Sequence, residues 1–169
     1  MSSLQVDSIS SMGGGHVDGA GLVVQCVYHQ WNDVTVRTSS GFGAAAGSKL
    51  SFTPKFADSL LVITYDFSFA VEWVSGIVHT GGAAKIYHNG TAIQSVAQKY
   101  ELYNNALDGA SVGGAALFAR QTKINSVSAG STSARDIELY FASYTPTSNK
   151  VTVNREGNYS NLLVQEIAQ

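Results

Sequence analysis

Charged side chains are scarce in this chain of 169 residues. Asp, Glu, Lys and Arg together make up 13% of it, about half of the usual share of about 25%. The formal net charge is −2. A protein that binds nucleic acid needs a dense Lys and Arg surface to displace counterions from phosphates. The composition therefore excludes that class, and we expect no nucleic-acid partner.

Cysteine and metal-binding patterns are lacking as well. The single cysteine, Cys26, excludes a disulfide scaffold and any zinc site built from several cysteines. It stands in an apolar run, where we expect it to be a small buried side chain. The histidines His16, His29, His79 and His88 show no spacing that would place two imidazoles on one metal ion. No calcium loop is present either, so we expect neither a metal nor another cofactor.

Long apolar runs and a basic leader are missing too. The aliphatic stretch at residues 60–63 is far shorter than the roughly 20 residues that span a membrane. The N-terminus has no basic segment, and the first arginine is Arg37, unlike a secretory signal peptide. We therefore expect a soluble protein without membrane insertion and without signal-dependent export.

Alternation of apolar and polar side chains dominates from Leu22 onward. Apolar residues make up 44% of the chain, with seven Phe, eight Tyr and two Trp, enough for a core. Short alternating runs separated by turn residues predict β-strands. The expected strands lie at residues 22–31, 34–38, 49–53, 60–71, 84–88, 91–96, 115–119, 137–144, 151–153 and 162–167.

Helical periodicity is weak, and Tyr100–Leu107 is the one stretch where we expect a turn or two of helix. Many short strands without a repeat indicate an all-β fold, an antiparallel β-sandwich of the jelly-roll-like type. The length suits one such domain, which we place at residues 22–169.

The Asn89-Gly90 pair suits a type I′ hairpin turn, in which both central residues have positive φ.

The long strand at residues 60–71 has apolar side chains on both faces. Leu61 and Ile63 lie on one face, and Leu60 and Val62 lie on the other. A small sandwich cannot easily bury both faces of a strand, so we expect one of them to contact another subunit.

Residues 1–21 predict an extended N-terminal arm with a glycine-rich linker. Leu4, Val6 and Ile9 are separated by polar residues, as in a short strand, and glycines follow at 13–15, 19 and 21. A strand-like tip on a flexible tether can pair with a neighbour, either another copy or a larger assembly. A frayed terminus without a partner is the alternative.

Two segments resemble catalytic or phosphate-binding motifs, but neither has the surrounding residues that its chemistry needs. Gly109–Gly113 matches the G-x-S-x-G pattern of a nucleophile elbow around Ser111, but that mechanism needs a histidine later in the chain. All four histidines precede Ser111. The glycine-rich segment 41–49 lacks the spacing of a phosphate-binding loop and leads into a strand. We therefore expect no enzymatic activity.

One segment has the composition of a recognition loop. Tyr100, Tyr103, Asn104 and Asn105 combine rigid amphipathic rings with adaptable amides, a pairing typical of binding surfaces. We take them as a candidate receptor-facing loop. An ordinary solvated loop, with its tyrosines packed on the sheet, is the alternative.

Several stretches together resemble a family of small bacteriophage virion proteins. The family has a short N-terminal leader, a G-h-V-Q-h-V strand, an L-S-h-T-P-K segment, an S-K-I-L-V segment, a hairpin and a closing strand. The corresponding stretches lie at residues 4–9, 21–27, 50–55, 60–62, 86–93 and 162–167. Leu60 stands where the family has Lys-Ile, and residues 99–111 have no counterpart in it.

The resemblance implies a non-enzymatic structural protein on the virion exterior, assembled in the host cytoplasm as a trimer of β-sandwich domains. Within it we favour a tail fibre that contacts a host receptor, such as a surface glycan, and is anchored to other virion proteins by its arm. A capsid decoration protein that stabilises the head is the first alternative. A lectin-like carbohydrate-binding module is the alternative from another class.

Overall fold

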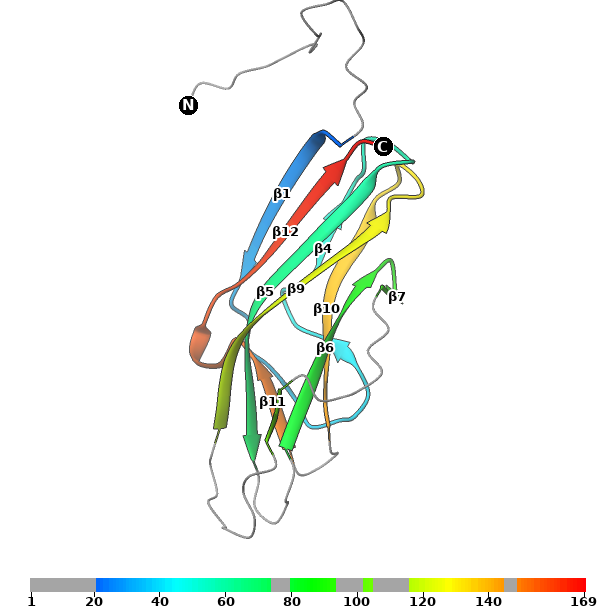
Figure 1. The fold of residues 1–169 in the computed structure, drawn as a ribbon. Coiled ribbons are helices and arrows are strands. Elements are labelled where there is room, and N and C mark those ends of the chain that lie inside the picture. Colours follow the sequence, from blue (N-terminus) through cyan, green and yellow to red (C-terminus); the bar gives the residue numbers. More distant parts are fainter. Residues whose placement is uncertain (1–20, 74–79, 94–101, 105–115, 145–148) are drawn as a thin grey trace, which may run out of the picture.

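The computed structural model describes residues 21–73, 80–93, 102–104, 116–144 and 149–169. Within these ranges the chain forms β-strands and one short 3₁₀ turn, with no α-helix (Figure 1). The strands are β1 (Val23–Trp31), β2 (Thr35–Arg37), β3 (Gly43–Ala44), β4 (Leu50–Phe52), β5 (Leu60–Trp73), β6 (Thr80–His88), β7 (Thr91–Ala92), β8 (Leu102–Asn104), β9 (Ala116–Ser128), β10 (Arg135–Ser143), β11 (Asn149–Val153) and β12 (Ser160–Ile167), and the turn is η1 (Arg155–Gly157). The predicted all-β class is confirmed.

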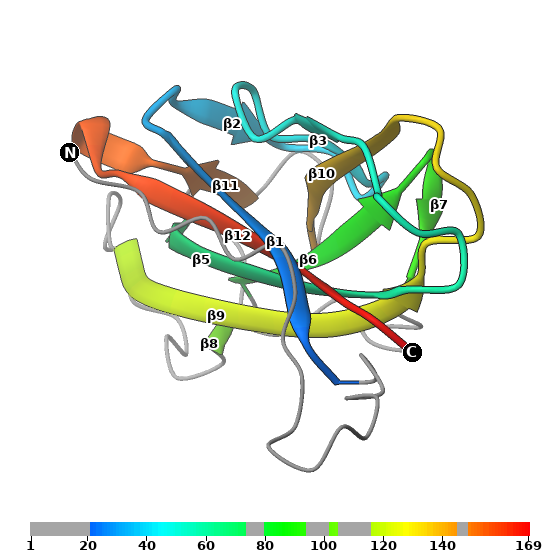
Figure 2. The same ribbon diagram turned by 90° about the horizontal axis from the view of Figure 1, so that it is seen from above.

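The strands form two antiparallel sheets, which Figures 1 and 2 show facing each other. In the first sheet β5 is central: β9 pairs with it along one edge, and β12 and β11 pair with successive parts of its other edge. β1 extends that sheet beyond β12, and β2 extends it beyond β11. In the second sheet β10 pairs with β6 on one side and with β3 and β4 on the other, while β7 and β8 pair with β6. This is the predicted antiparallel sandwich.

The core lies between the two sheets. Tyr65, Phe67, Phe69 and Val71 of β5 all point inward and are buried, as the alternation predicts. Phe69 meets Phe141 of the second sheet edge to face, with ring centroids 6.3 Å apart, an arrangement that aromatic pairs prefer. Burial of these rings between the sheets provides the main stabilisation of the fold.

The structure decides which face of β5 is open. Leu61 and Ile63 are fully buried against the second sheet, so a single chain covers that face by itself. Leu60 and Val62, on the opposite face, keep part of their surface exposed. A subunit contact on β5 would therefore use the face of Leu60 and Val62 rather than that of Ile63.

The prediction for Cys26 is wrong, because this thiol is exposed. Cys26 pairs with Gln165 of β12 and shares the outward face of the first sheet with Tyr28, whereas Val27 between them packs on the core. The run from Leu22 to Val27 is apolar except at Gln25, and Gln25 is on the same side as Val27, where its amide donates to Glu166. Its composition could not show which positions face the core.

The expected helical turn at Tyr100–Leu107 is also wrong where the structure describes it. Leu102–Asn104 forms β8, which pairs with the first residues of β6, including Gly81 and Gly82. Pairing with the free edge of β6 is a tertiary interaction, and it overrides the weak local preference for helix.

Other strands differ from the prediction in length. β9 continues to Ser128, nine residues past the predicted end, because its inward positions Gln121, Lys123 and Asn125 are polar and hide the alternation. The short strand β3 lies inside the segment 39–47 that was expected to be only a loop. The Asn89-Gly90 turn is confirmed, with φ angles of 50° and 78°.

Candidate binding face

The outer face of the first sheet is almost free of charge. Along β1, β12, β9 and the first nine residues of β5, Asp66 and Arg120 are the charged side chains that point outward. The remaining outward positions are polar or apolar, including the exposed side chains of Tyr28, Phe118 and Ile124. An exposed surface of this composition suits contact with another molecule better than simple solvation.

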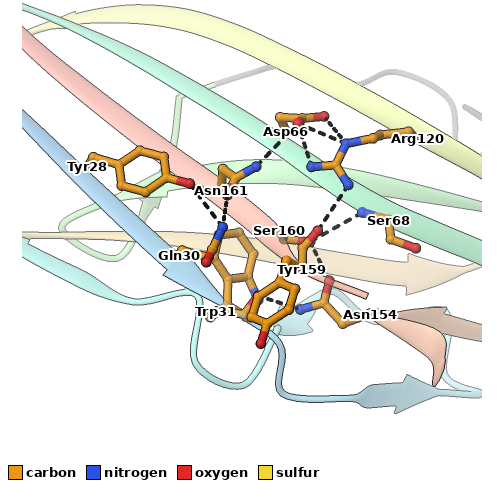
Figure 3. A network of polar contacts seen from close by, with 10 residues as sticks. All are labelled: Tyr28, Gln30, Trp31, Asp66, Ser68, Arg120, Asn154, Tyr159, Ser160 and Asn161. Carbon is orange, nitrogen blue, oxygen red and sulfur yellow. Dashed lines mark hydrogen bonds and ion pairs between the residues drawn. The ribbon is translucent and has the colours of Figure 1, made fainter. Parts of the chain in front are cut away.

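Asp66 and Arg120 form the centre of a polar network on this face (Figure 3). The Nε of Arg120 donates to Oδ1 of Asp66 at 2.9 Å, and Nη2 donates to Oδ2 at 2.6 Å. Nη1 donates to the backbone carbonyl of Tyr159 at 3.0 Å. The bidentate pair and the third hydrogen bond fix the plane of the guanidinium.

The network continues across the sheet to β1. The Tyr28 hydroxyl donates to Oδ1 of Asn161 at 2.6 Å, and Nε2 of Gln30 donates to the same oxygen at 2.9 Å. Nδ2 of Asn161 donates to Asp66 at 3.5 Å. Hydrogen bonds thus connect side chains of four neighbouring strands into one ordered surface (Figure 3).

A second set of contacts attaches this surface to the interior. The backbone N–H of Ser68 donates to the Ser160 hydroxyl at 3.2 Å, and that hydroxyl contacts the amide of buried Asn154. In the amide orientation that satisfies its partners, Asn154 accepts from Nε1 of Trp31 at 3.0 Å. Trp31 belongs to the core. Hydrogen bonds through Asn154 and Ser160 therefore connect the outer face of the sheet to the core.

Next to Arg120 the outer face is hollowed into an open depression of about 260 Å³. Phe118 contributes an exposed ring, and the guanidinium carbon of Arg155 lies 4.8 Å from its centroid, within the range of a cation–π contact. Ser68, Phe118, Ala119, Arg120 and Asn158 line the depression. It combines an aromatic ring with fixed hydrogen-bonding groups.

Glu166 is the most thoroughly hydrogen-bonded buried acid that the structure describes. Its carboxylate is fully buried and accepts from the backbone N–H groups of Lys55 and Phe56, from the Ser59 hydroxyl and from Nε2 of Gln25. Burial alone would raise the pKa of Glu166, but these hydrogen bonds outweigh it and lower the pKa. All of its acceptor sites are used, so this group ties the 55–59 loop to β12 and has a structural role.

Most of the residues predicted to bind lie outside the described residues. This holds for Leu4, Val6 and Ile9 of the arm and for Tyr100 and Asn105. Ser111, which was rejected as a nucleophile, also lies outside them. Tyr103 and Asn104 lie in β8, where their backbones pair with Gly81 and Thr80.

Sequence reasoning missed Asp66, Arg120, Asn161 and Phe118. Each stands alone among uncharged neighbours in its own strand, and they come from three strands far apart in the chain. The only local signal was the scarcity of charge, which makes any outward charged residue in a strand unusual.

Among the described residues, no group of three or more His, Cys, Asp or Glu side chains is arranged to hold a metal ion. The same residues contain no helix with the length and apolar character needed to cross a membrane.

No protein-family model matches the chain, and no curated protein matches it. A similar solved structure is the crystal structure of dimeric latent PorU from Porphyromonas gingivalis. The sequence identity is 12% and the TM-score is 0.40, over 88% of this chain and 14% of the PorU chain. At that TM-score the likeness supports no statement about function.

Proposed function

We propose that this chain is a non-enzymatic structural protein of a bacteriophage virion exterior, a tail-fibre component that binds the host surface and is anchored by residues 1–21. The proposal needs no cofactor and no catalytic step. It is supported by the resemblance to virion proteins and by one observation, the placement of Gly21, to which the arm is joined, and of Leu102–Asn104 at opposite ends of the sandwich.

The arm enters at the end of the sandwich where β12 ends. Gly21 N–H donates to the carbonyl of Ala168 at 2.7 Å, and Ile167 pairs with Leu60, the first residue of β5. Asn104, which precedes Asn105, pairs with Thr80, the first residue of β6. In Figure 1 the start of β6 lies beside the end of β5, at the other end of the sandwich. The 14 residues of β5 separate these ends by about 45 Å at about 3.3 Å per residue. We assign attachment to the first of these ends and receptor contact to the second.

We assign the trimer contact to the apolar part of the outer face, near the arm. Val62, Ile124 and Leu163 lie in two neighbouring rows of the first sheet, and Ile124 is 62% exposed. Thr64 lies between Leu163 and Ile124, and Gln165 and Ser126 flank Val62. Together these side chains offer an uncharged surface with exposed apolar groups, which another copy would cover favourably. The depression beside Arg120 lies farther along β5 from Leu60 than this contact does, so we expect it to stay accessible in such an assembly.

A lectin-like carbohydrate-binding module is the second candidate, and the depression at Phe118 and Arg120 supports it. A lectin-like module would use the same binding surface as the tail-fibre component, but it would not be part of a virus particle. A capsid decoration role is distinguished from a tail-fibre role by its position on the particle.

The experiment compares particles assembled with the full chain and with a chain lacking residues 1–20. We expect the full chain to be found at the tail by cryo-electron microscopy, and we expect the truncated chain to fold but to be lost from particles. Added free protein is expected to compete with particles for adsorption to host cells. Unchanged occupancy by the truncated chain, or a position on the head lattice, would contradict the proposal. Binding to glycans by a chain absent from particles would favour the lectin-like module.

A further inference from the structure

The size of the depression on the outer face suits one small ring. Its volume of about 260 Å³ is slightly below the lower limit of about 300 Å³ for pockets that hold drug-sized molecules. It is open to solvent on one side, so a ring at the end of a longer chain could enter it while the remainder stays outside.

An apolar contact is available on one wall. Phe118 is 53% exposed, and the packing of Arg155 against its ring restrains the ring position. An exposed aromatic ring binds the C–H face of a flat ligand through its apolar surface and its negative π-face. Because the ring is already held, little conformational entropy is lost when a ligand packs on it.

Hydrogen-bonding groups are available beside that ring. A guanidinium has five N–H groups, and Arg120 uses one on Nε, one on Nη2 and one on Nη1 for Asp66 and the Tyr159 carbonyl. Two N–H groups, five minus three, remain for a ligand. Asn158 uses its NH₂ on the Arg155 carbonyl at 2.8 Å, which leaves its amide oxygen as an acceptor.

The charges around the depression are already balanced. Asp66 lies within 2.6 Å of Arg120, and Glu72 lies 3.2 Å from Arg155. An acidic ligand would approach both a guanidinium and the carboxylate that neutralises it, so its own charge would gain little. The site therefore offers directed N–H groups without net positive charge, which favours a neutral ligand rich in hydroxyl groups.

We propose that this depression is a binding subsite for a neutral pyranose, with the sugar ring packed on Phe118 and its hydroxyls bound by Arg120 and Asn158. The inference deepens the proposed receptor-binding function and rests on it for its biological meaning. It places the ligand on the outer face of the first sheet and on residues other than the predicted Tyr100, Tyr103, Asn104 and Asn105.

The test is a titration of the full chain, followed by protein-observed NMR, with the methyl glycosides of glucose, galactose and mannose and with glucuronate as the charged counterpart. We expect at least one neutral glycoside to bind and to shift the resonances of Phe118 and Arg120, with glucuronate weaker. Phe118→Ala should weaken binding at least tenfold. Phe56→Ala is the matched control, since it removes a phenylalanine ring of similar exposure, 49%, from the loop at residues 55–59, and its binding should be unchanged.

The subsite is overturned if no neutral glycoside binds, if glucuronate binds more tightly, or if Phe118→Ala and Phe56→Ala behave alike. Its failure can be separated from failure of the virion role. Particles that carry Phe118→Ala and still adsorb normally would overturn the subsite as the receptor contact and leave the tail-fibre role standing. If the chain binds glycosides but is absent from particles, the subsite stands and the tail-fibre role is contradicted.

Discussion

Glu166 shows at the scale of one residue how a buried charge is held without a cation. Its carboxylate is surrounded by two backbone N–H groups, a hydroxyl and an amide. Hydrogen bonds to the charged form lower its pKa, so the folded state binds protons less readily than the unfolded state. The resulting stability is complete above the ordinary value of 4.5 and is lost as the pH falls through the lowered pKa.

We predict that Glu166→Gln lowers the free energy of unfolding by about 2 kcal/mol at neutral pH, since an amide NH₂ would face donors that the carboxylate satisfied. The variant should also lose less stability than the wild type as the pH falls below 4.5. Urea denaturation at several pH values measures both effects. Glu156→Gln, at a side chain 74% exposed, is the control and should change stability little.

His88 provides a separate pH effect that should survive in the Glu166→Gln variant. Burial and then the nearby charge of Arg135 lower the pKa of His88 below its ordinary value of 6.5. Since the unfolded state then binds the proton more readily, stability falls as the pH drops below 6.5 in both proteins. A wild-type curve that is flat between pH 6.5 and 5 would contradict this prediction.

At the scale of single elements, the hairpin between β6 and β7 depends on backbone conformation. Gly90 has a φ of 78°, a conformation that costs other residues about 1 kcal/mol. We predict that Gly90→Ala lowers the free energy of unfolding by about 1 kcal/mol, measured by thermal or urea denaturation. Space is not limiting, because a Cβ at Gly90 would meet no atom within 4 Å. Gly90→Asn should restore part of the loss, because asparagine tolerates this conformation better than alanine.

The two faces of the first sheet predict opposite outcomes for the same chemical change. Ile63 of β5 is fully buried, whereas Ile124 of β9 is exposed. We predict that Ile63→Lys prevents folding, because the core cannot solvate an unpaired ammonium. Ile124→Lys should leave the circular dichroism spectrum unchanged. Folding of the Ile63→Lys variant would show that the sheets do not pack as described.

At the scale of the whole molecule, Ile124 also tests the assembly. If three copies associate through the apolar part of the outer face, a charge at Ile124 is desolvated in the contact and should dissociate the trimer. Analytical ultracentrifugation should show a trimer for the wild type and single chains for Ile124→Lys. A trimer that persists in this variant would place the contact elsewhere, and a wild type without self-association would contradict the proposed trimer itself.

The sequence by itself determined the class of the fold. Alternation along residues 60–71 and the Asn89-Gly90 turn are local signals, since side chains of a strand alternate between faces and a tight hairpin needs positive φ. Both are seen in the structure. Where polar residues occupy inward positions, as along β9 from Gln121 to Asn125, the local signal failed.

Only the tertiary structure decided which face of each strand is covered and which distant residues meet. Cys26 could have pointed either way, because the polar residue next to it, Gln25, lies on the inward side, where its amide donates to Glu166. Asp66, Arg120 and Asn161 come together because β5, β9 and β12 pair in one register. A strand's sequence sets its period but not its partners, since pairing depends on backbone contacts between segments far apart in the chain.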